Sequence, residues 1–495
     1  MKTNNLISVD ARQCGAGKTT NIENGIYSRI NKNLSNQTNS IVVAGSKSLQ
    51  YQYKNRYQQM IVINDDNKNS SVIKDITTAM EFNFPLICIT HQAYCLLEWS
   101  LLRTDYDCIL DEAINGLLEE HTISITSNKF VDFKWNQHFE ISYGSDQLKY
   151  EDFLEVNKFP RNEFYRLTII GGEDNNLMLS DSYRKLTSRN KDYYITMYDY
   201  NIMQGNDSRS KTFNVYSIFT SRLFSGWKSM HIAASAFDKT QMFHVLKYNN
   251  MEFFYTHKFN KHTGNIKLHS VANTYTDKHG KINSFTWSNY KRINHREIIE
   301  SFHDYVNAIT NGDKILSLRN LSETSNLSNE EKLGHSVHGL NKEEWQSITN
   351  ISMESALRPS NQMILFIKQV VLDGINETEM DQIITDMFSS YLFYQAIMRC
   401  KLRSNNYNNE NINIFTLDYN VALNLCEYFD IDENDYEPFE VQWNKPEPID
   451  KKERNRRAYE KSKPQQEIME KRTPMTSTER SRLCREKKKQ ELLKK

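Results

Sequence analysis

Short apolar runs alternate with longer polar segments along the first half of the chain. Six runs have about the length of a short strand: Leu6–Val9, Ile41–Ala44, Met60–Ile63, Leu86–Thr90, Cys108–Leu110 and His231–Ala234. Apolar runs of this kind, separated by helix-compatible segments, are typical of parallel strands covered by helices on both faces. The pattern therefore predicts an α/β fold built on a parallel sheet.

The alternation lapses between about 121 and 228, where aromatic, charged and Asn-rich sequence predicts an insertion of unknown role in the first domain. A second series predicts the strands Ile266–Val271, Lys314–Leu318, Ser347–Ile351 and Asn413–Leu417 and the helices His295–Thr310, Asn361–Leu372 and Glu379–Arg403. We therefore expect an α/β domain over residues 1–255, a second over 256–440, and a linker and tail over 441–495.

Length and composition indicate a multidomain globular protein. The chain has 495 residues, which exceeds the ~250–300 residues of a typical single core. No apolar run approaches the ~18 residues needed to cross a bilayer, and the N-terminus has no apolar signal segment, so we expect a cytoplasmic protein without a membrane partner. The seven cysteines are scattered and form no C-x-x-C pair, which predicts neither a disulfide framework nor a zinc site.

Charge is distributed unevenly along the chain. Residues 451–495 hold 17 Lys and Arg against 7 Asp and Glu, so this tail has a net charge of +10 and the remaining chain has −10. A basic tail on an acidic body suits an auxiliary contact with a polyanion. The alternative is a solvated, partly disordered end.

The segment Ala11–Thr20, with the sequence ARQCGAGKTT, follows the first predicted strand and precedes a polar, helix-like stretch. Glycines allow successive backbone N–H groups to converge on phosphate oxygens at a helix N-terminus. A lysine after them reaches the β and γ phosphates, and the next hydroxyl holds Mg²⁺. The pattern predicts an ATP-binding loop with Mg²⁺ on Thr19, formed by Gly15, Ala16, Gly17, Lys18, Thr19 and Thr20.

A second acidic motif follows about 90 residues later. The run Tyr106–Leu110 reads as a strand, and the adjacent carboxylates Asp111 and Glu112 come directly after it. We expect Asp111 to bind the Mg²⁺ and Glu112 to orient and deprotonate the attacking water. Capping of a following helix is the alternative role of this pair.

The loop and Asp111-Glu112-Ala113 together resemble the DEAD-like group of superfamily 2 helicases and translocases. Arg12 stands where the strict loop pattern has a glycine, a position that many loops of the family relax. Three further segments resemble family motifs in the family's order: 41–49, 89–93 and 234–237. In the family, the first contacts the nucleic-acid backbone and the last couples hydrolysis to domain movement.

Near the end of the second domain, residues 395–403 resemble the family motif of a glutamine followed by two arginines. Gln395, Arg399 and Arg403 would share one helical face and reach across an interdomain cleft. A planar, permanently charged guanidinium suits the charge that develops on the γ-phosphate. The family's second arginine lies seven residues after the glutamine, whereas Arg403 lies eight residues after Gln395. Arg399 is therefore the better candidate for this role and Arg403 the poorer one.

The resemblance extends over residues 1 to about 420. Residues 338–341 and 316–319 could match two further motifs of the second domain, and either could be an ordinary loop. What the resemblance implies is two RecA-like domains, ATP and Mg²⁺ as cofactors, and a nucleic-acid partner. The branch most similar is that of viral, phage and plasmid replication helicases, with a looser similarity to herpesvirus origin-binding helicases. This similarity favours DNA over RNA.

Two alternatives remain. A phage packaging-type motor would carry a nuclease domain with clustered carboxylates, and no obvious triad follows residue 260. A non-enzymatic nucleic-acid-binding scaffold with a decayed helicase fold would not require the intact residues Lys18, Thr19, Asp111 and Glu112.

Overall fold

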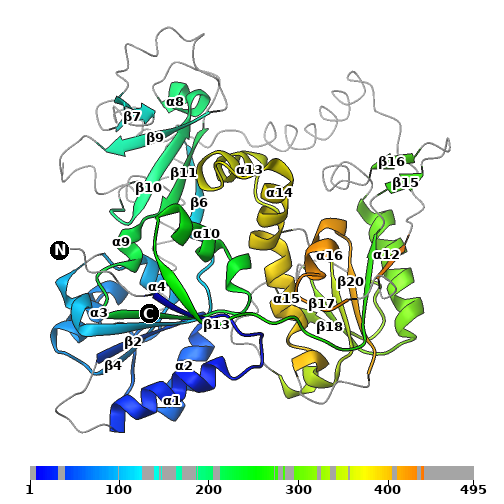
Figure 1. The fold of residues 1–495 in the computed structure, drawn as a ribbon, viewed down its shortest axis with the longest axis horizontal. Helices are drawn as coiled ribbons and strands as arrows, with labels where there is room; N and C mark the ends of the chain where they lie inside the picture. The colour runs from blue at the N-terminus through cyan, green and yellow to red at the C-terminus, as the bar shows by residue number, and fades with distance from the viewer. Residues whose placement is uncertain are drawn as a thin grey trace, which may run out of the picture.

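The computed structural model describes residues 7–31, 39–98, 100–124, 139–143, 146–147, 163–169, 186, 188–203, 212–271, 274–276, 282–284, 295–319, 325–334, 342–354, 357–403, 410–431 and 436–439. Two lobes lie side by side, with a further sheet projecting from the first (Figure 1). We refer to residues 7–257 as lobe 1 and to residues 266–439 as lobe 2. Within the described ranges, no helix is long and apolar enough to span a membrane.

Lobe 1 is built on a parallel sheet in the order β13-β1-β12-β5-β2-β4-β3. Its strands are β1 (Ile7–Asp10), β2 (Asn39–Ala44), β3 (Ile61–Val62), β4 (Leu86–Thr90), β5 (Tyr106–Asp111), β12 (Ser229–Ala233) and β13 (Phe253–His257). Ile41 and Val43 point into one core cluster and Val42 and Ala44 into another. Both faces of β2 are therefore buried, which explains its uninterrupted apolar sequence.

Helices cover both faces of this sheet. The first pair is α1 (Lys18–Asn31) and α2 (Lys47–Arg56), which pack on the same face. On the other face lie α3 (Val72–Glu81), α4 (His91–Leu96) and α10 (Gln241–Tyr248). Shorter helical turns are η2 (Leu101–Asp105), α9 (Ser221–Phe224) and η5 (Phe237–Lys239).

The insertion forms an antiparallel sheet in the order β6-β11-β10-β9-β7-β8. Its elements are β6 (Leu118–Ser124), β7 (Phe139–Tyr143), β8 (Asp146–Gln147), β9 (Phe164–Ile169), β10 (Lys191–Thr196), α8 (Met197–Met203) and β11 (Thr212–Phe219). One face packs against α8, with Phe213 and Val215 in its core. The next residues along β11, Tyr216 and Ile218, join the core of lobe 1 instead.

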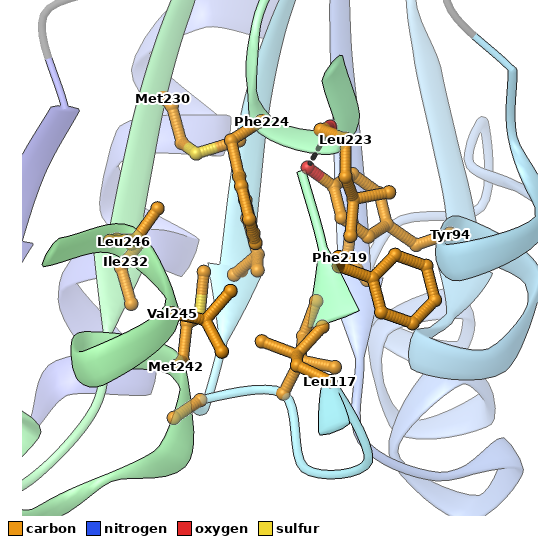
Figure 2. Close-up of a cluster of buried hydrophobic side chains, with 14 of the residues drawn as sticks. Tyr94, Leu117, Phe219, Leu223, Phe224, Met230, Ile232, Met242, Val245 and Leu246 are labelled. Carbon is orange, nitrogen blue, oxygen red and sulfur yellow. Dashed lines mark hydrogen bonds between the residues drawn. The ribbon is translucent and has the colours of Figure 1, made fainter. Parts of the chain in front are cut away.

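The junction between the insertion and lobe 1 is a packed apolar cluster (Figure 2). Leu117 and Phe219 lie where the chain leaves and re-enters lobe 1. The hydroxyl of the buried Tyr94 donates a hydrogen bond to the Leu223 carbonyl oxygen at 2.9 Å. This packing ties the insertion to lobe 1.

Lobe 2 contains a second parallel sheet in the order β18-β17-β19-β20-β14-β21. Its elements are β14 (Ile266–Val271), the hairpin β15 (Thr274–Thr276) and β16 (Ile282–Ser284), α12 (His295–Thr310), β17 (Ile315–Leu318), β18 (Glu330–Leu333), η6 (Glu343–Ser347), β19 (Asn350–Met353), β20 (Ile412–Thr416), α16 (Tyr419–Leu425) and β21 (Tyr436–Phe439). These two parallel sheets, with the insertion in lobe 1, confirm the α/β fold of two RecA-like domains.

The two helices expected over 361–372 and 379–403 are present, with π-helical turns and a different end to the second. The first is α13 (Asn361–Phe366) continued by the π-helix η7 (Ile367–Val371). The second runs through α14 (Glu377–Thr385), the π-helix η8 (Asp386–Ser390) and α15 (Tyr391–Ile397), and it ends before the 3-10 turn η9 (Lys401–Arg403). The two π-helical turns interrupt the regular α-helical hydrogen bonding, and the helical path turns at Met398.

Residues 357–390, which we call the arm, reach from lobe 2 back to the insertion (Figure 1). Phe366 is fully buried among the rings of Phe164, Tyr194 and Tyr216, with ring centroids 5.4–5.5 Å apart. The N-cap residue of α13, Ser360, also donates a hydrogen bond to a Glu120 carboxylate oxygen of β6 at 2.6 Å. The arm thus packs in the core of lobe 1 although its sequence belongs to lobe 2.

Candidate functional site

The phosphate-loop motif lies between β1 and the first turn of α1. Gly15 and Gly17 have φ angles of 84° and 76°, which a side chain would disfavour. The ammonium of Lys18 donates hydrogen bonds to the carbonyl oxygens of Arg12 and Gln13 at 2.7 and 3.0 Å and to Ser235 Oγ at 2.6 Å. Burial lowers the pKa of Lys18 against the pull of nearby carboxylates. Lys18 is therefore held by the loop where phosphate oxygens would replace these acceptors.

Arg12 forms an ion pair that a glycine at this position could not form. Its guanidinium donates to both carboxylate oxygens of Asp10, from Nε at 2.9 Å and from Nη2 at 2.5 Å. Burial of Asp10 raises its pKa, but the hydrogen bonds from Arg12 outweigh this and keep the pKa below its usual value. The arginine at which the loop departs from the strict motif therefore forms an ion pair with Asp10, the last residue of β1.

The acidic motif ends β5 directly beside the loop. Asp111 is buried, accepts a hydrogen bond from the Tyr53 hydroxyl at 2.7 Å, and lies 3.3 Å from Thr19 Oγ1. Burial, together with the charge of the neighbouring Glu112, raises the pKa of Asp111 to about 6. A carboxylate and a hydroxyl held this close are oxygen ligands of the kind that Mg²⁺ prefers, so the pair fits a Mg²⁺ site.

Glu112 turns away from the strand by adopting an unusual backbone conformation. Its φ is 96°, and its N–H donates to the Ala233 carbonyl oxygen at 3.1 Å. A positive φ at a residue with a side chain is costly and is found most often at functional sites. The turn carries the Glu112 side chain into the cleft between the lobes.

The cleft consists of two adjoining pockets of about 290 and 260 Å³. Both are lined by Thr19, Thr20, Asp111 and Glu112 of lobe 1 and by Arg399 and Arg403 of lobe 2. The larger pocket also includes Gly15, Gly17, Lys18 and Gln395. Residues from two distant parts of the sequence therefore surround one cavity.

Two polar atoms of lobe 2 are buried here without a hydrogen-bond partner among the described residues: Gln395 Oε1 and Arg399 Nε. Arg399 Nη2 lies 3.9 Å from Glu112 Oε1. A buried polar group without a partner is costly, so these atoms are suited to a ligand in the cleft. Arg403 also lines both pockets and approaches the loop, since a Cβ at Gly15 would lie 3.6 Å from its Cγ. The structure thus places Arg403 at the cleft as well as Arg399, despite its spacing in the motif.

The three further segments that resemble family motifs include or directly follow the carboxyl ends of β2, β4 and β12, which lie along one edge of the lobe 1 sheet. Ser46 and Thr90 cap α2 and α4 through their side chains. Ser235 contacts both Lys18 and the Cys14 thiol, and Ala236 lies in the core of lobe 2. This segment therefore touches the phosphate loop and the opposite lobe at once.

Other predicted segments lie elsewhere. Arg319, after β17, is buried and donates from Nη2 to Glu330 Oε2 at 2.8 Å instead of facing the cleft. Residues 338–341 and the tail 451–495 lie outside the described residues.

Sequence reasoning missed three tyrosines around the site. Tyr53 contacts Asp111, the Tyr391 hydroxyl accepts a hydrogen bond from Gln395 Nε2 at 2.9 Å, and the Tyr394 hydroxyl accepts one from the Cys14 N–H at 3.1 Å. Tyr391 and Tyr394 lie close in sequence to Gln395 of the recognised motif, and this proximity was a signal that could have pointed to them. Tyr53 stands in an ordinary polar helix and carries no such signal.

No protein-family model matches the chain, and a search of curated proteins found no match. Solved structures that it resembles include Mss116p, with its NTE and C-tail deleted, bound to ssRNA and AMP-PNP. The TM-score is 0.35 at 8% sequence identity, and the alignment covers 89% of this chain and 72% of that chain. What we infer about function therefore rests on the residues of this chain.

Proposed function

We propose that this protein is an ATP-dependent nucleic-acid helicase or translocase of the superfamily 2 type. The observation that carries the proposal is the shared cleft, in which Lys18 and Glu112 of lobe 1 face Arg399 of lobe 2. A phosphate loop, a metal-binding carboxylate and an arginine from a second lobe are the parts that ATP hydrolysis needs.

Each side chain has a distinct role in this proposal. Lys18 exchanges its loop carbonyl acceptors for β and γ phosphate oxygens. Thr19 and Asp111 would hold Mg²⁺, which supplies charge neutralisation at the phosphates when bound. Glu112 orients the attacking water and accepts its proton. Arg399 stabilises the charge that grows on the γ-phosphate, and Gln395 helps to orient the same groups.

Nucleic acid is the proposed polymer, and the similarity of the motifs to replication helicases makes DNA the expected one. The segments after β2, β4 and β12 lie along the same edge of the sheet as the nucleotide site. Closure of the lobes around ATP would therefore move the segments proposed to grip the strand. The tail 451–495 would add an electrostatic contact.

The test is ATP turnover by purified wild-type protein alone, with single-stranded DNA, with duplex DNA and with RNA. Lys18→Ala should abolish turnover, because it removes the charge that faces the phosphates. Lys74→Ala, a matched loss of an exposed lysine on α3, should leave turnover unchanged. Absence of turnover with every polymer would overturn the proposal in favour of a binding scaffold, and stimulation by RNA alone would overturn the expected preference for DNA.

A further inference from the structure

A hydroxyl of lobe 2 binds the backbone of the phosphate loop directly. Tyr394 lies on α15, and its hydroxyl oxygen accepts a hydrogen bond from the Cys14 N–H at 3.1 Å. The same hydroxyl lies 2.9 Å from Nε2 of His262, in the connection between the two lobes. Three parts of the chain that are far apart in sequence thus meet at one oxygen.

The direction of the first of these hydrogen bonds is fixed by its donor, and that of the second follows the tautomer of His262. The Cys14 N–H is only a donor, so the Tyr394 oxygen accepts from it and its proton is available to His262. Burial, with a further contribution from Lys18, lowers the pKa of His262 to about 4, so the ring is neutral near pH 7. Nε2 accepts from the Tyr394 hydroxyl in the tautomer that carries the ring proton on Nδ1. The result is a chain of hydrogen bonds from Cys14 through Tyr394 to His262.

Packing prevents the Tyr394 ring from moving aside. The residue is fully buried and stacks on Tyr428, with ring centroids 4.7 Å apart and planes at 25°. The Tyr428 hydroxyl in turn donates to Asp386 at 3.2 Å, and Asp386 lies 3.4 Å from the ammonium of Lys239 in lobe 1. Tyr394 is therefore fixed within lobe 2 and linked to lobe 1 by a second route.

The segment that holds Tyr394 also carries the residues of lobe 2 that face the cleft. Gln395 is the next residue, and Arg399 follows in the turn after α15, where its N–H donates to the Ala396 carbonyl oxygen at 2.9 Å. Because these residues belong to one hydrogen-bonded segment, the contact at Cys14 sets the distance between the phosphate loop and the Arg399 guanidinium. An error of about 1 Å in such a position can cost on the order of 100-fold in rate.

We propose that Tyr394 is a positioning residue: its hydroxyl fastens the phosphate loop at Cys14 to the segment carrying Gln395 and Arg399 and so places Arg399 for hydrolysis. This inference rests on the proposed ATPase function. Nucleotide affinity depends mainly on the loop, Lys18 and Thr19, which belong to lobe 1. The hydroxyl should therefore act on kcat more than on ATP binding.

Tyr394→Phe removes the hydroxyl and keeps the stacked ring. We expect kcat to fall about tenfold, while the Kd of a fluorescent ATP analogue changes less than twofold. The matched control is Tyr94→Phe, which removes an equally buried hydroxyl that donates to the Leu223 carbonyl oxygen (Figure 2) and belongs to a residue that lines neither pocket of the cleft. This control should leave kcat within twofold of wild type, and thermal unfolding should show that both variants are folded.

His262 provides a second, independent variant. His262→Gln keeps an acceptor for the Tyr394 proton and should retain most of the wild-type kcat, whereas His262→Leu should lower kcat. The double variant Tyr394→Phe/His262→Leu should be no slower than Tyr394→Phe alone, because both changes break one chain. Wild-type kcat in Tyr394→Phe, or an equal loss in Tyr94→Phe, would overturn this inference alone. Absence of turnover in the wild type would overturn the proposed function and this inference with it.

Discussion

Arg399 Nη2 of lobe 2 lies 3.9 Å from Glu112 Oε1 of lobe 1, across the mouth of the phosphate loop. The two side chains come from residues 287 positions apart in sequence, and both line the cleft that contains Lys18. A carboxylate that activates water and a guanidinium that stabilises phosphate charge need to act on the same γ-phosphate. Their proximity is therefore the geometry that the proposed hydrolysis requires.

Arg399→Ala should lower kcat on the order of 100-fold or more while leaving the Kd for ATP within a few-fold of wild type. The arginine acts on charge that develops only in the transition state. Steady-state ATPase assays and fluorescent nucleotide binding measure the two effects. Lys401→Ala is the control, because Lys401 belongs to the same segment but pairs with Glu410 at 2.8 Å outside the cleft. An equal loss in both variants would show that the arginine has no special role.

Glu112→Gln should bind ATP and fail to hydrolyse it. The amide keeps the size of the side chain but cannot accept the proton of the attacking water, while Thr19 and Asp111 remain to hold the metal. Single-turnover hydrolysis together with nucleotide binding separates the two steps. If this variant lost ATP binding instead, the assigned roles of Asp111 and Glu112 would be wrong.

Lowering the pH from about 6.5 to about 4 should decrease the free energy of unfolding of the wild type relative to His262→Gln. The pKa of His262 is lowered to about 4 in the folded protein by burial and by Lys18, against 6.5 in the unfolded chain. Between these values the unfolded state binds a proton that the folded state does not, so acid favours unfolding. Urea unfolding of both proteins across this pH range tests the point. If the free energies of unfolding of the two proteins changed equally with pH, the burial of neutral His262 in the folded protein would be contradicted.

Phe366→Ala should reduce the free energy of unfolding by about 3 kcal/mol, because it leaves a cavity among three aromatic rings. It should also loosen the arm from the insertion, which increased protease cleavage within residues 357–390 would detect. Gln369→Ala, at an exposed position of the same arm, should change stability by less than about 0.5 kcal/mol. Similar stability of the two variants would show that the arm contributes little to the packing.

Deletion of residues 451–495 should weaken nucleic-acid binding and flatten its dependence on salt. Each phosphate neutralised on duplex DNA contributes about −0.9 to the slope of log K against log salt. Hydrolysis without nucleic acid should not change, since none of the candidate site residues lies in the tail. Titration of one DNA at several salt concentrations compares the two proteins. Equal slopes would assign the whole DNA contact to the lobes.

Local sequence was sufficient for the elements that are buried on both faces and for the motifs whose chemistry is local. The run 41–44 is apolar at every position because both faces of β2 are covered, and β1, β4, β5 and β12 are recognisable for the same reason. The edge strands β13, β18 and β21 were missed because most of their side chains are partly or fully exposed, so their sequences show neither an apolar run nor a regular alternation of apolar and polar residues. The phosphate loop was readable because its glycines, lysine and threonine are consecutive.

Only the tertiary structure decided which distant residues meet. Tyr394 and Cys14 are 380 positions apart, and nothing in the sequence around either residue indicates the other. The packing of Phe366 in lobe 1 and the approach of Arg403 to Gly15 were equally hidden. Periodicity and short motifs indicate which secondary structure a segment adopts and which of its faces is buried. Contacts between segments depend instead on how the lobes, the insertion and the arm pack, and that packing is determined by the whole chain at once.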